Sequence, residues 1–182
     1  MKICVYGSSS PLLDQVFYDE AFKLGREMAQ RGHSLIFGGG ENGLMGACVR
    51  GLESAGGKSL GVAPRFFDRP GILHKGCDQF IFTEDMSERK NIMEREADAF
   101  IAVPGGLGTF EELLQALTLT QLSQMDKPVA ILNTDGYYDA LSALIDQAIA
   151  RKFADGSVRE IFGVFGDTEE LLNYLEGKQK ER

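Results

Sequence analysis

The sequence predicts a single α/β domain in which a doubly wound parallel sheet carries helices on both faces. Short apolar runs of β-rich composition alternate with longer runs of helical periodicity along the whole chain. The strand-like runs are almost continuously apolar, as is typical of parallel strands buried on both faces. No repeat or linker divides the 182 residues, which suffice for one sizeable core. We therefore expect one domain over residues 1–176 and a charged, frayed tail at 177–182.

Apolar periodicity and flanking glycine or proline residues place the elements in order. The first helix is the clearest, because Phe17, Ala21, Leu24 and Met28 share one face and Gly32 follows the last turn. The expected strands are 2–6, 34–37, 58–63, 78–82, 99–103, 128–132 and 161–165. The expected helices are 13–30, 43–55, 87–97, 109–124, 138–149 and 168–175. This order is Rossmann-like, and such folds bind ligands beyond the carboxyl ends of the strands.

The net charge of the chain limits the kinds of molecule that it is expected to bind. The chain has 27 acidic and 19 basic residues, which gives a formal net charge of -8. This balance argues against a nucleic-acid surface, which needs a basic patch, but a small phosphate can be bound by backbone amides and one or two cations. No apolar run reaches the ~18 residues of a membrane span, and the N-terminal residues lack the apolar region of a signal peptide.

The cysteines and histidines form no evident metal or redox motif. Cys4, Cys48 and Cys77 are widely spaced, so we expect reduced structural thiols and a cytoplasmic protein. His33 and His74 lie far apart in the sequence without an obvious partner. The sequence therefore indicates neither a metal site nor a cofactor.

Three loops that follow expected strands are rich in glycine or small residues, at 7–10, 38–46 and 104–112. Glycine lets backbone amides approach an anion, and a following helix adds free N–H groups and a positive dipole end. Each loop alone is equally typical of a tight turn, but together they would form a cradle for a phosphorylated ligand. The second loop also fits a dinucleotide fingerprint, which we discount because the next strand lacks the acidic residue that would hold a ribose.

Charged residues near the third loop are candidates for chemistry. Glu112 lies about one turn inside the expected helix, although capping near a helix start also accounts for Glu111 and Glu112. Ser87 is the expected N-cap of the preceding helix, which places Arg89 and Lys90 in its first turn. The helix dipole disfavours cations there, so the pair indicates an anionic ligand or partner, with a solvated face as the alternative.

Residues 104–112 read PGGLGTFEE and match the motif PGGxGTxxE, and Ser87-Glu88-Arg89-Lys90 precedes them. With these paired motifs the chain resembles the LONELY GUY family of cytokinin-activating phosphoribohydrolases, long labelled "possible lysine decarboxylases". The similarity covers nearly the whole chain. It implies a nucleotide-binding domain that hydrolyses the N-glycosidic bond of an adenine-type nucleoside 5'-monophosphate to the free base and ribose 5-phosphate.

The resemblance also implies roles for particular residues. Arg89 and Glu112 match the catalytic pair, in which Glu112 would act on the ribose and the attacking water, while Arg89 keeps Glu112 ionised and binds substrate. The candidate substrate and phosphate contacts are Gly7, Ser8, Gly39, Gly40, Met86, Lys90, Gly105, Gly106, Leu107, Gly108, Thr109, Glu111 and Thr118. The family implies a homodimer whose partner chain completes the base pocket, with no metal or redox cofactor.

One departure from the family pattern concerns the base. Plant members carry a glutamate in the loop after the third strand, where this chain has Gly71, and Asp68 is a substitute for it. Two other functions stay open. The first is a non-catalytic carrier of a nucleotide or of molybdenum cofactor on the same fold. The second, a pyridoxal-phosphate decarboxylase, is disfavoured because no lysine sits in an evident Schiff-base setting.

Overall fold

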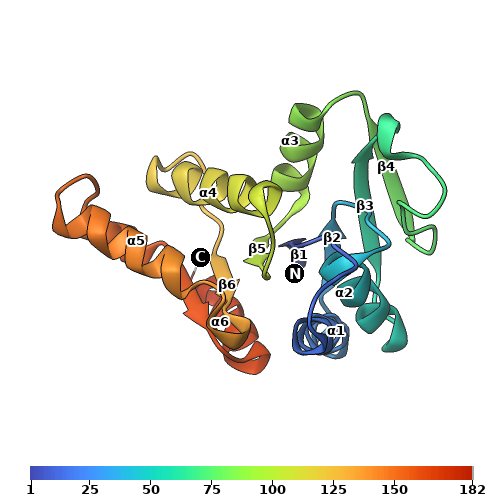
Figure 1. The fold of residues 1–182 in the computed structure, drawn as a ribbon, viewed down its shortest axis with the longest axis horizontal. Coiled ribbons are helices and arrows are strands. Elements are labelled where there is room, and N and C mark those ends of the chain that lie inside the picture. Colours follow the sequence, from blue (N-terminus) through green and yellow to red (C-terminus); the bar gives the residue numbers. More distant parts are fainter. Residues whose placement is uncertain (182) are drawn as a thin grey trace.

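The computed structural model describes residues 1–181, and within them seven parallel strands form one sheet with six α-helices around it (Figure 1). The strands are β1 (Lys2–Tyr6), β2 (Ser34–Phe37), β3 (Ser59–Pro64), β4 (Gln79–Thr83), β5 (Ala99–Ala102), β6 (Val129–Leu132) and β7 (Phe162–Phe165). The helices are α1 (Gln15–Gln30), α2 (Gly43–Ser54), α3 (Met86–Glu96), α4 (Leu107–Gln121), α5 (Asp139–Ala150) and α6 (Thr168–Lys180). Short 3-10 turns are η1 (Arg65–Phe67), η2 (Thr134–Gly136) and η3 (Gly156–Glu160). None of the helices described is long and apolar enough to cross a membrane.

The two faces of the sheet carry separate cores, which confirms the doubly wound architecture. One core joins the sheet to α1, α2 and α6 through buried residues such as Leu24, Leu52 and Leu172. The other joins it to α3, α4 and α5, with Met93 and Leu113 fully buried. Figure 1 shows α1 and α2 on one side of the strands and α3 and α4 on the other. The alternation of strands and helices read from the sequence therefore describes the fold correctly.

The strand order β4-β3-β2-β1-β5-β6-β7 reverses its direction between β1 and β5. The chain builds outward from β1 to β4 and then returns to place β5 on the other side of β1, with Cys4 opposite Phe100. The connections after β1 and β5 therefore leave toward opposite faces and open a crevice at the carboxyl ends of the strands. This is the sheet edge at which the glycine-rich loops lie.

The helix α3 begins one residue earlier than expected. Its N-cap is Asp85 and not Ser87, because the Asp85 carboxylate accepts a 2.8 Å hydrogen bond from Glu88 N. Arg89 and Lys90 are consequently the fourth and fifth helical residues, at the end of the first turn. The dipole penalty expected for these two cations is smaller there.

Two further helix boundaries correct the expectation. The N-cap of α4 is Gly106, so Thr109 lies in the first turn and does not cap the helix. The last helix continues to Lys180, beyond the expected end at residue 175, so residues 177–180 are helical. Basic side chains in the last turn of α6 stabilise its carboxyl end. The rest of the expected tail includes Arg182, which lies outside the described residues.

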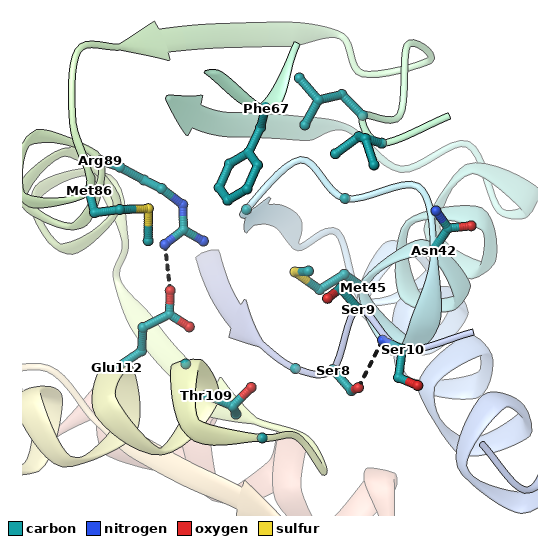
Figure 2. A pocket seen from close by; sticks show the side chains of 17 residues that line it. Ser8, Ser9, Ser10, Asn42, Met45, Phe67, Met86, Arg89, Thr109 and Glu112 are labelled. Carbon is teal, nitrogen blue, oxygen red and sulfur yellow. Dashed lines mark hydrogen bonds and ion pairs between the residues drawn. The ribbon is translucent and has the colours of Figure 1, made fainter. Parts of the chain in front are cut away.

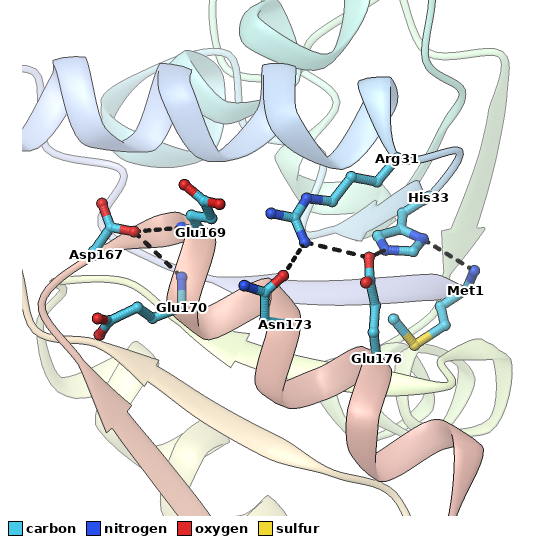
Figure 3. A network of polar contacts seen from close by, with 8 residues as sticks. All are labelled: Met1, Arg31, His33, Asp167, Glu169, Glu170, Asn173 and Glu176. Carbon is cyan, nitrogen blue, oxygen red and sulfur yellow. Dashed lines mark hydrogen bonds and ion pairs between the residues drawn. The ribbon is translucent and has the colours of Figure 1, made fainter.

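Polar contacts fasten α6 to the start of the sheet (Figure 3). The carboxylate of Asp167 caps the helix by accepting from two backbone N–H groups of its first turn. Glu176 accepts from Arg31 and lies 2.9 Å from Nε2 of His33, whose Nδ1 is 3.3 Å from the Met1 amine. His33 was expected to have no obvious partner, and these contacts join residues too far apart in sequence for any local pattern to show.

Candidate active site

A cavity of about 570 Å³ opens at the carboxyl ends of the strands. All three glycine-rich loops contribute to its lining, together with η1, the segment after it and the start of α3. Figure 2 shows Arg89 and Glu112 pointing toward one another from α3 and α4, with Ser8 and Ser10 across the cavity from them. The volume is in the range of small-molecule sites in proteins.

Arg89 and Glu112 form a buried ion pair in the wall of this cavity. Arg89 Nη1 donates to Glu112 Oε1 at 2.5 Å, and the two side chains are 8% and 10% exposed. Arg89 Nε donates to the carbonyl oxygen of Val62 at the end of β3, at 3.1 Å. Two bonds therefore fix the guanidinium plane and hold one carboxylate oxygen of Glu112.

The protonation of Glu112 is set by two opposing effects. Burial raises the pKa of Glu112 above its ordinary value, and the positive charge of Arg89 lowers it, with the net direction upward. Arg89 was expected to keep Glu112 ionised, and its charge does lower the pKa of Glu112, but burial has the larger effect. A cavity carboxyl whose pKa is displaced toward neutrality is suited to exchanging a proton with substrate or water.

Gly38, at the end of β2, makes room for the pair. A β-carbon at this position would overlap Arg89 Nη2, so only glycine lets the guanidinium lie against the backbone here. Gly38 also lines the cavity. The residue belongs to the second glycine loop of the sequence, but its packing against Arg89 joins two segments that no local pattern connects.

The N-terminus of α4 lies at the cavity, where the third loop was expected to bind an anion. Gly106, Gly108 and Thr109 line the cavity at the first turn, where helical N–H groups have no partner within the helix. A hydrogen bond fixes the backbone that precedes this turn, because the Tyr137 hydroxyl donates to the carbonyl oxygen of Gly105 at 2.5 Å. An anion at this turn would also meet the positive end of the α4 dipole.

The first two glycine loops serve mainly to bind each other. The Ser8 carbonyl accepts from Leu44 N at 2.8 Å and from Met45 N at 3.4 Å, which occupies the first N–H groups of α2. Ser8 N in turn donates to Pro104 O at 3.1 Å. Gly43, with φ +63°, is required because a β-carbon there would overlap the Ser8 carbonyl. Leu44 N and Met45 N at the start of α2 therefore already have a backbone acceptor, and all three loops line the cavity.

Nine of the residues predicted for the site line the cavity. They are Gly7, Ser8, Gly40, Met86, Arg89, Gly106, Gly108, Thr109 and Glu112. Six others do not line it: Gly39, Lys90, Gly105, Leu107, Glu111 and Thr118. The side chain of Lys90 pairs with Glu111 and donates to Gln115 Oε1 at 2.6 Å, and the Thr118 hydroxyl donates to the carbonyl of Leu114 at 2.7 Å.

Several lining residues were not predicted individually. Phe67, Ile72 and Leu73 come from the segment after β3, whose unusual length was the only signal in the sequence. Gly71, with φ +76°, and the exposed Asp68 do not line the cavity of this chain. Within residues 1–181, no group of three or more His, Cys, Asp or Glu side chains is placed to hold a metal ion.

A Rossmann-like sheet with a helix N-terminus and a buried carboxylate at its switch point defines a nucleotide-binding α/β protein. A family model described as "Possible lysine decarboxylase" matches residues 45–175. A "Probable cytokinin riboside 5'-monophosphate phosphoribohydrolase" of Oryza sativa subsp. japonica is 42% identical over 96% of this chain and 78% of that protein. An Arabidopsis thaliana protein named as the same enzyme is 41% identical over 96% and 77%. The chain belongs to this family.

The fold also resembles that of proteins with another stated role. The solved molybdenum cofactor carrier protein of Chlamydomonas reinhardtii superposes with a TM-score of 0.74. The alignment covers 100% of this chain and 98% of that one, at 24% identity. This likeness shows a shared fold.

Proposed function

We propose that this protein hydrolyses the N-glycosidic bond of an adenine-type nucleoside 5'-monophosphate and releases the free base and ribose 5-phosphate. Its relatives in the family, at about 40% identity over 96% of the chain, carry the name of this activity for cytokinin riboside monophosphates. The observation that carries the proposal is the buried Arg89–Glu112 pair beside the N-terminus of α4.

The chemistry assigns a role to each part of the site. A phosphate group binds at Gly106, Gly108 and Thr109, where helix N–H groups converge. Cleavage breaks the bond between C1' and the base nitrogen, and positive charge develops on the ribose. The Glu112 carboxylate stabilises this charge and accepts a proton from the attacking water, whose oxygen bonds to C1'. The base nitrogen takes up the proton that Glu112 received from water, so the carboxylate is regenerated and the reaction consumes one water.

Arg89 interacts with both the Glu112 carboxylate and the substrate in this mechanism. It orients the Glu112 carboxylate through Nη1, and its remaining N–H groups are available to substrate oxygens. The other predicted contacts that line the cavity, Gly7, Ser8, Gly40 and Met86, belong to the same substrate site. Lys90, Glu111 and Thr118, together with Gly39, Gly105 and Leu107, support the site from outside this cavity.

Release of base distinguishes this enzyme from a nucleotide or cofactor carrier. Incubation with AMP, followed by chromatography, is expected to yield adenine and ribose 5-phosphate. Glu112→Gln keeps the size of the side chain and removes its charge, so it should bind AMP but lose base release by about 100-fold or more. Binding of AMP without release by the unchanged protein would favour the carrier. Undiminished release by Glu112→Gln would refute the role of this carboxylate.

We further infer a cytoplasmic homodimer. Exposed leucines on the face of α4 and α5, Leu114, Leu122 and Leu144, support association with a second chain that completes the base pocket. Cys4 and Cys48 are unpaired and buried, which suits a reducing compartment. The partners we propose are a small nucleotide and a second copy, and the net charge of -8 disfavours nucleic acid.

A further inference from the structure

His74 lies between two carboxylates beside the cavity. Its Nδ1 is 2.7 Å from Glu41 Oε2, and its Nε2 is 2.6 Å from Glu53 Oε1. The ring is 10% exposed. Glu41 belongs to the glycine loop before α2, and Glu53 to the end of α2, so the ring joins two elements to its own segment.

This geometry favours a charged ring. A neutral imidazole has one N–H group, so it cannot donate to carboxylates at both nitrogens, whereas imidazolium can. Burial lowers the pKa of His74, but the two carboxylates outweigh it and raise the pKa above its ordinary value. The other charged neighbour is Arg50, which donates to the Glu41 carbonyl at 2.9 Å, and the Cys77 thiol contacts the His74 carbonyl.

The backbone around His74 runs along the glycine loop. His74 N donates to Gly39 O at 2.8 Å, and Glu41 N donates to Ile72 O at 2.9 Å. Gly40 and Leu73 form an isolated antiparallel bridge between these bonds. Ile72 and Leu73 line the cavity, as does Gly40, so this short ladder is itself part of the cavity wall.

We propose that His74 is a positioning residue for the substrate cavity, which holds segment 71–74 against the glycine loop through its bonds to Glu41 and Glu53. This inference rests on the proposed function for the identity of the substrate. The wall that it fixes presents Ile72 and Leu73, which suits the uncharged part of a nucleotide. His74 itself bonds to Glu41, Glu53 and the backbone of Gly39, and not to the Arg89–Glu112 pair. Loss of the imidazolium should therefore weaken binding more than chemistry.

The pH dependence follows from the same contacts. The stabilisation by His74 is complete below its ordinary pKa and is lost as pH rises through its raised pKa. Above that pH the ring keeps one N–H and faces one carboxylate with a lone pair. The KM of the unchanged protein is thus expected to rise with pH in this range.

Kinetics of His74→Gln with AMP test the proposal, and His33→Gln is the matched control, since it changes the other histidine away from the cavity. We expect His74→Gln to raise KM by about fivefold with kcat nearly unchanged, and to lose the rise of KM with pH. His33→Gln should leave both unchanged. A KM and pH profile of His74→Gln equal to those of the unchanged protein would overturn the proposal, as would a fall in kcat alone.

Hydrogen exchange separates this inference from the proposed function. The amides of residues 71–75 should exchange faster in His74→Gln than in the unchanged protein, whether or not AMP is cleaved. If the unchanged protein releases no base, the proposed function fails, and faster exchange with weaker AMP binding by calorimetry still supports the positioning role. Unchanged exchange refutes it, and so does faster exchange with unchanged affinity. If His74→Gln does not fold, Glu53→Gln replaces it and should give the same changes, smaller in size.

Discussion

The Arg89–Glu112 pair is costly to bury, and this cost bears on its role. Both side chains are about nine-tenths buried, and a buried ion pair often stabilises a protein no better than apolar residues of the same volume. Breaking one by truncation of a partner is strongly destabilising, by about 3–5 kcal/mol. Because apolar residues of the same volume would often stabilise the fold as well as this pair, stability alone does not explain why an ion pair is buried here. Its place in a cavity beside a helix N-terminus is better explained by chemistry.

Gly38→Ala tests how closely the backbone must approach Arg89. The added methyl group overlaps Arg89 Nη2, and the guanidinium cannot retreat without breaking its bonds to Glu112 or Val62. We expect base release to fall by at least about tenfold and the free energy of unfolding to fall by about 1–3 kcal/mol. Assays of AMP cleavage and urea denaturation measure the two effects.

Gly177→Ala is the matched control for this substitution. Gly177 lies in α6 away from the cavity, and a β-carbon there meets no atom within 4 Å. Alanine should leave activity unchanged and raise stability by about 0.5–1 kcal/mol, since glycine is the poorer helix former. Equal activity of Gly38→Ala and Gly177→Ala would show that Arg89 does not need the glycine.

At the scale of single residues, the sequence predicted the candidate site residues better than the residues that support them. Arg89, Glu112 and Thr109 stand in short motifs whose spacing is visible along the chain, and all three line the cavity. The approach of Gly38 to Arg89 was not predictable, because it joins residues on different elements. Glu41 and Glu53 could not be predicted as partners of His74 either, because they too lie on different elements from it.

For the helices and strands, the end residues were less predictable from the sequence than the presence of each element. The strands β1 and β2 have the expected bounds, because every residue after the first of each strand is buried and apolar. Helix starts depend on which of several polar residues turns its side chain back to the helix, and both Asp85 and Ser87 are suitable caps. The structure selects Asp85, and it selects Gly106 for α4 without any side-chain cap.

The contacts between α6 and His33 give a prediction for acid stability. His33 donates to Glu176 through Nε2 and accepts from the Met1 amine at Nδ1, which is the bonding pattern of the neutral ring. Burial lowers the pKa of His33 below its ordinary value, although Glu176 opposes this. The unfolded chain then binds more protons than the folded one, so stability falls as pH drops below the ordinary pKa of histidine.

His33→Gln removes this titration. Between pH 7 and 5, the free energy of unfolding should fall less in the variant than in the unchanged protein, with a difference in slope of at most about 1.4 kcal/mol per pH unit. Urea denaturation at several pH values provides the measurement. His74→Gln is the opposite control. It removes a group whose pKa is raised, so the free energy of unfolding should fall more steeply on acidification than in the unchanged protein. Identical slopes for His33→Gln and the unchanged protein would contradict a neutral His33.

At the scale of the whole molecule, the order of strands locates the site. Alternating strands and helices predicted a doubly wound sheet, but the sequence alone could not say that β5 lies beside β1. That pairing brings the loops after β1 and β5 together and makes the crevice between them. It also puts α3 and α4 on one face, from which Arg89 and Glu112 meet.

The same face carries exposed apolar side chains that predict how the molecule assembles. Leu122 at the end of α4 and Leu144 on α5 are each about three-fifths exposed, and a second chain packed on this face would remove their apolar surface from water. We expect Leu122→Glu combined with Leu144→Glu to convert a dimer to a monomer, measured by light scattering after gel filtration. Base release should then fall by about tenfold if the partner completes the base pocket as proposed. Val16→Glu on α1, which lies across the sheet, should change neither, and a monomeric unchanged protein with full activity would refute the shared site.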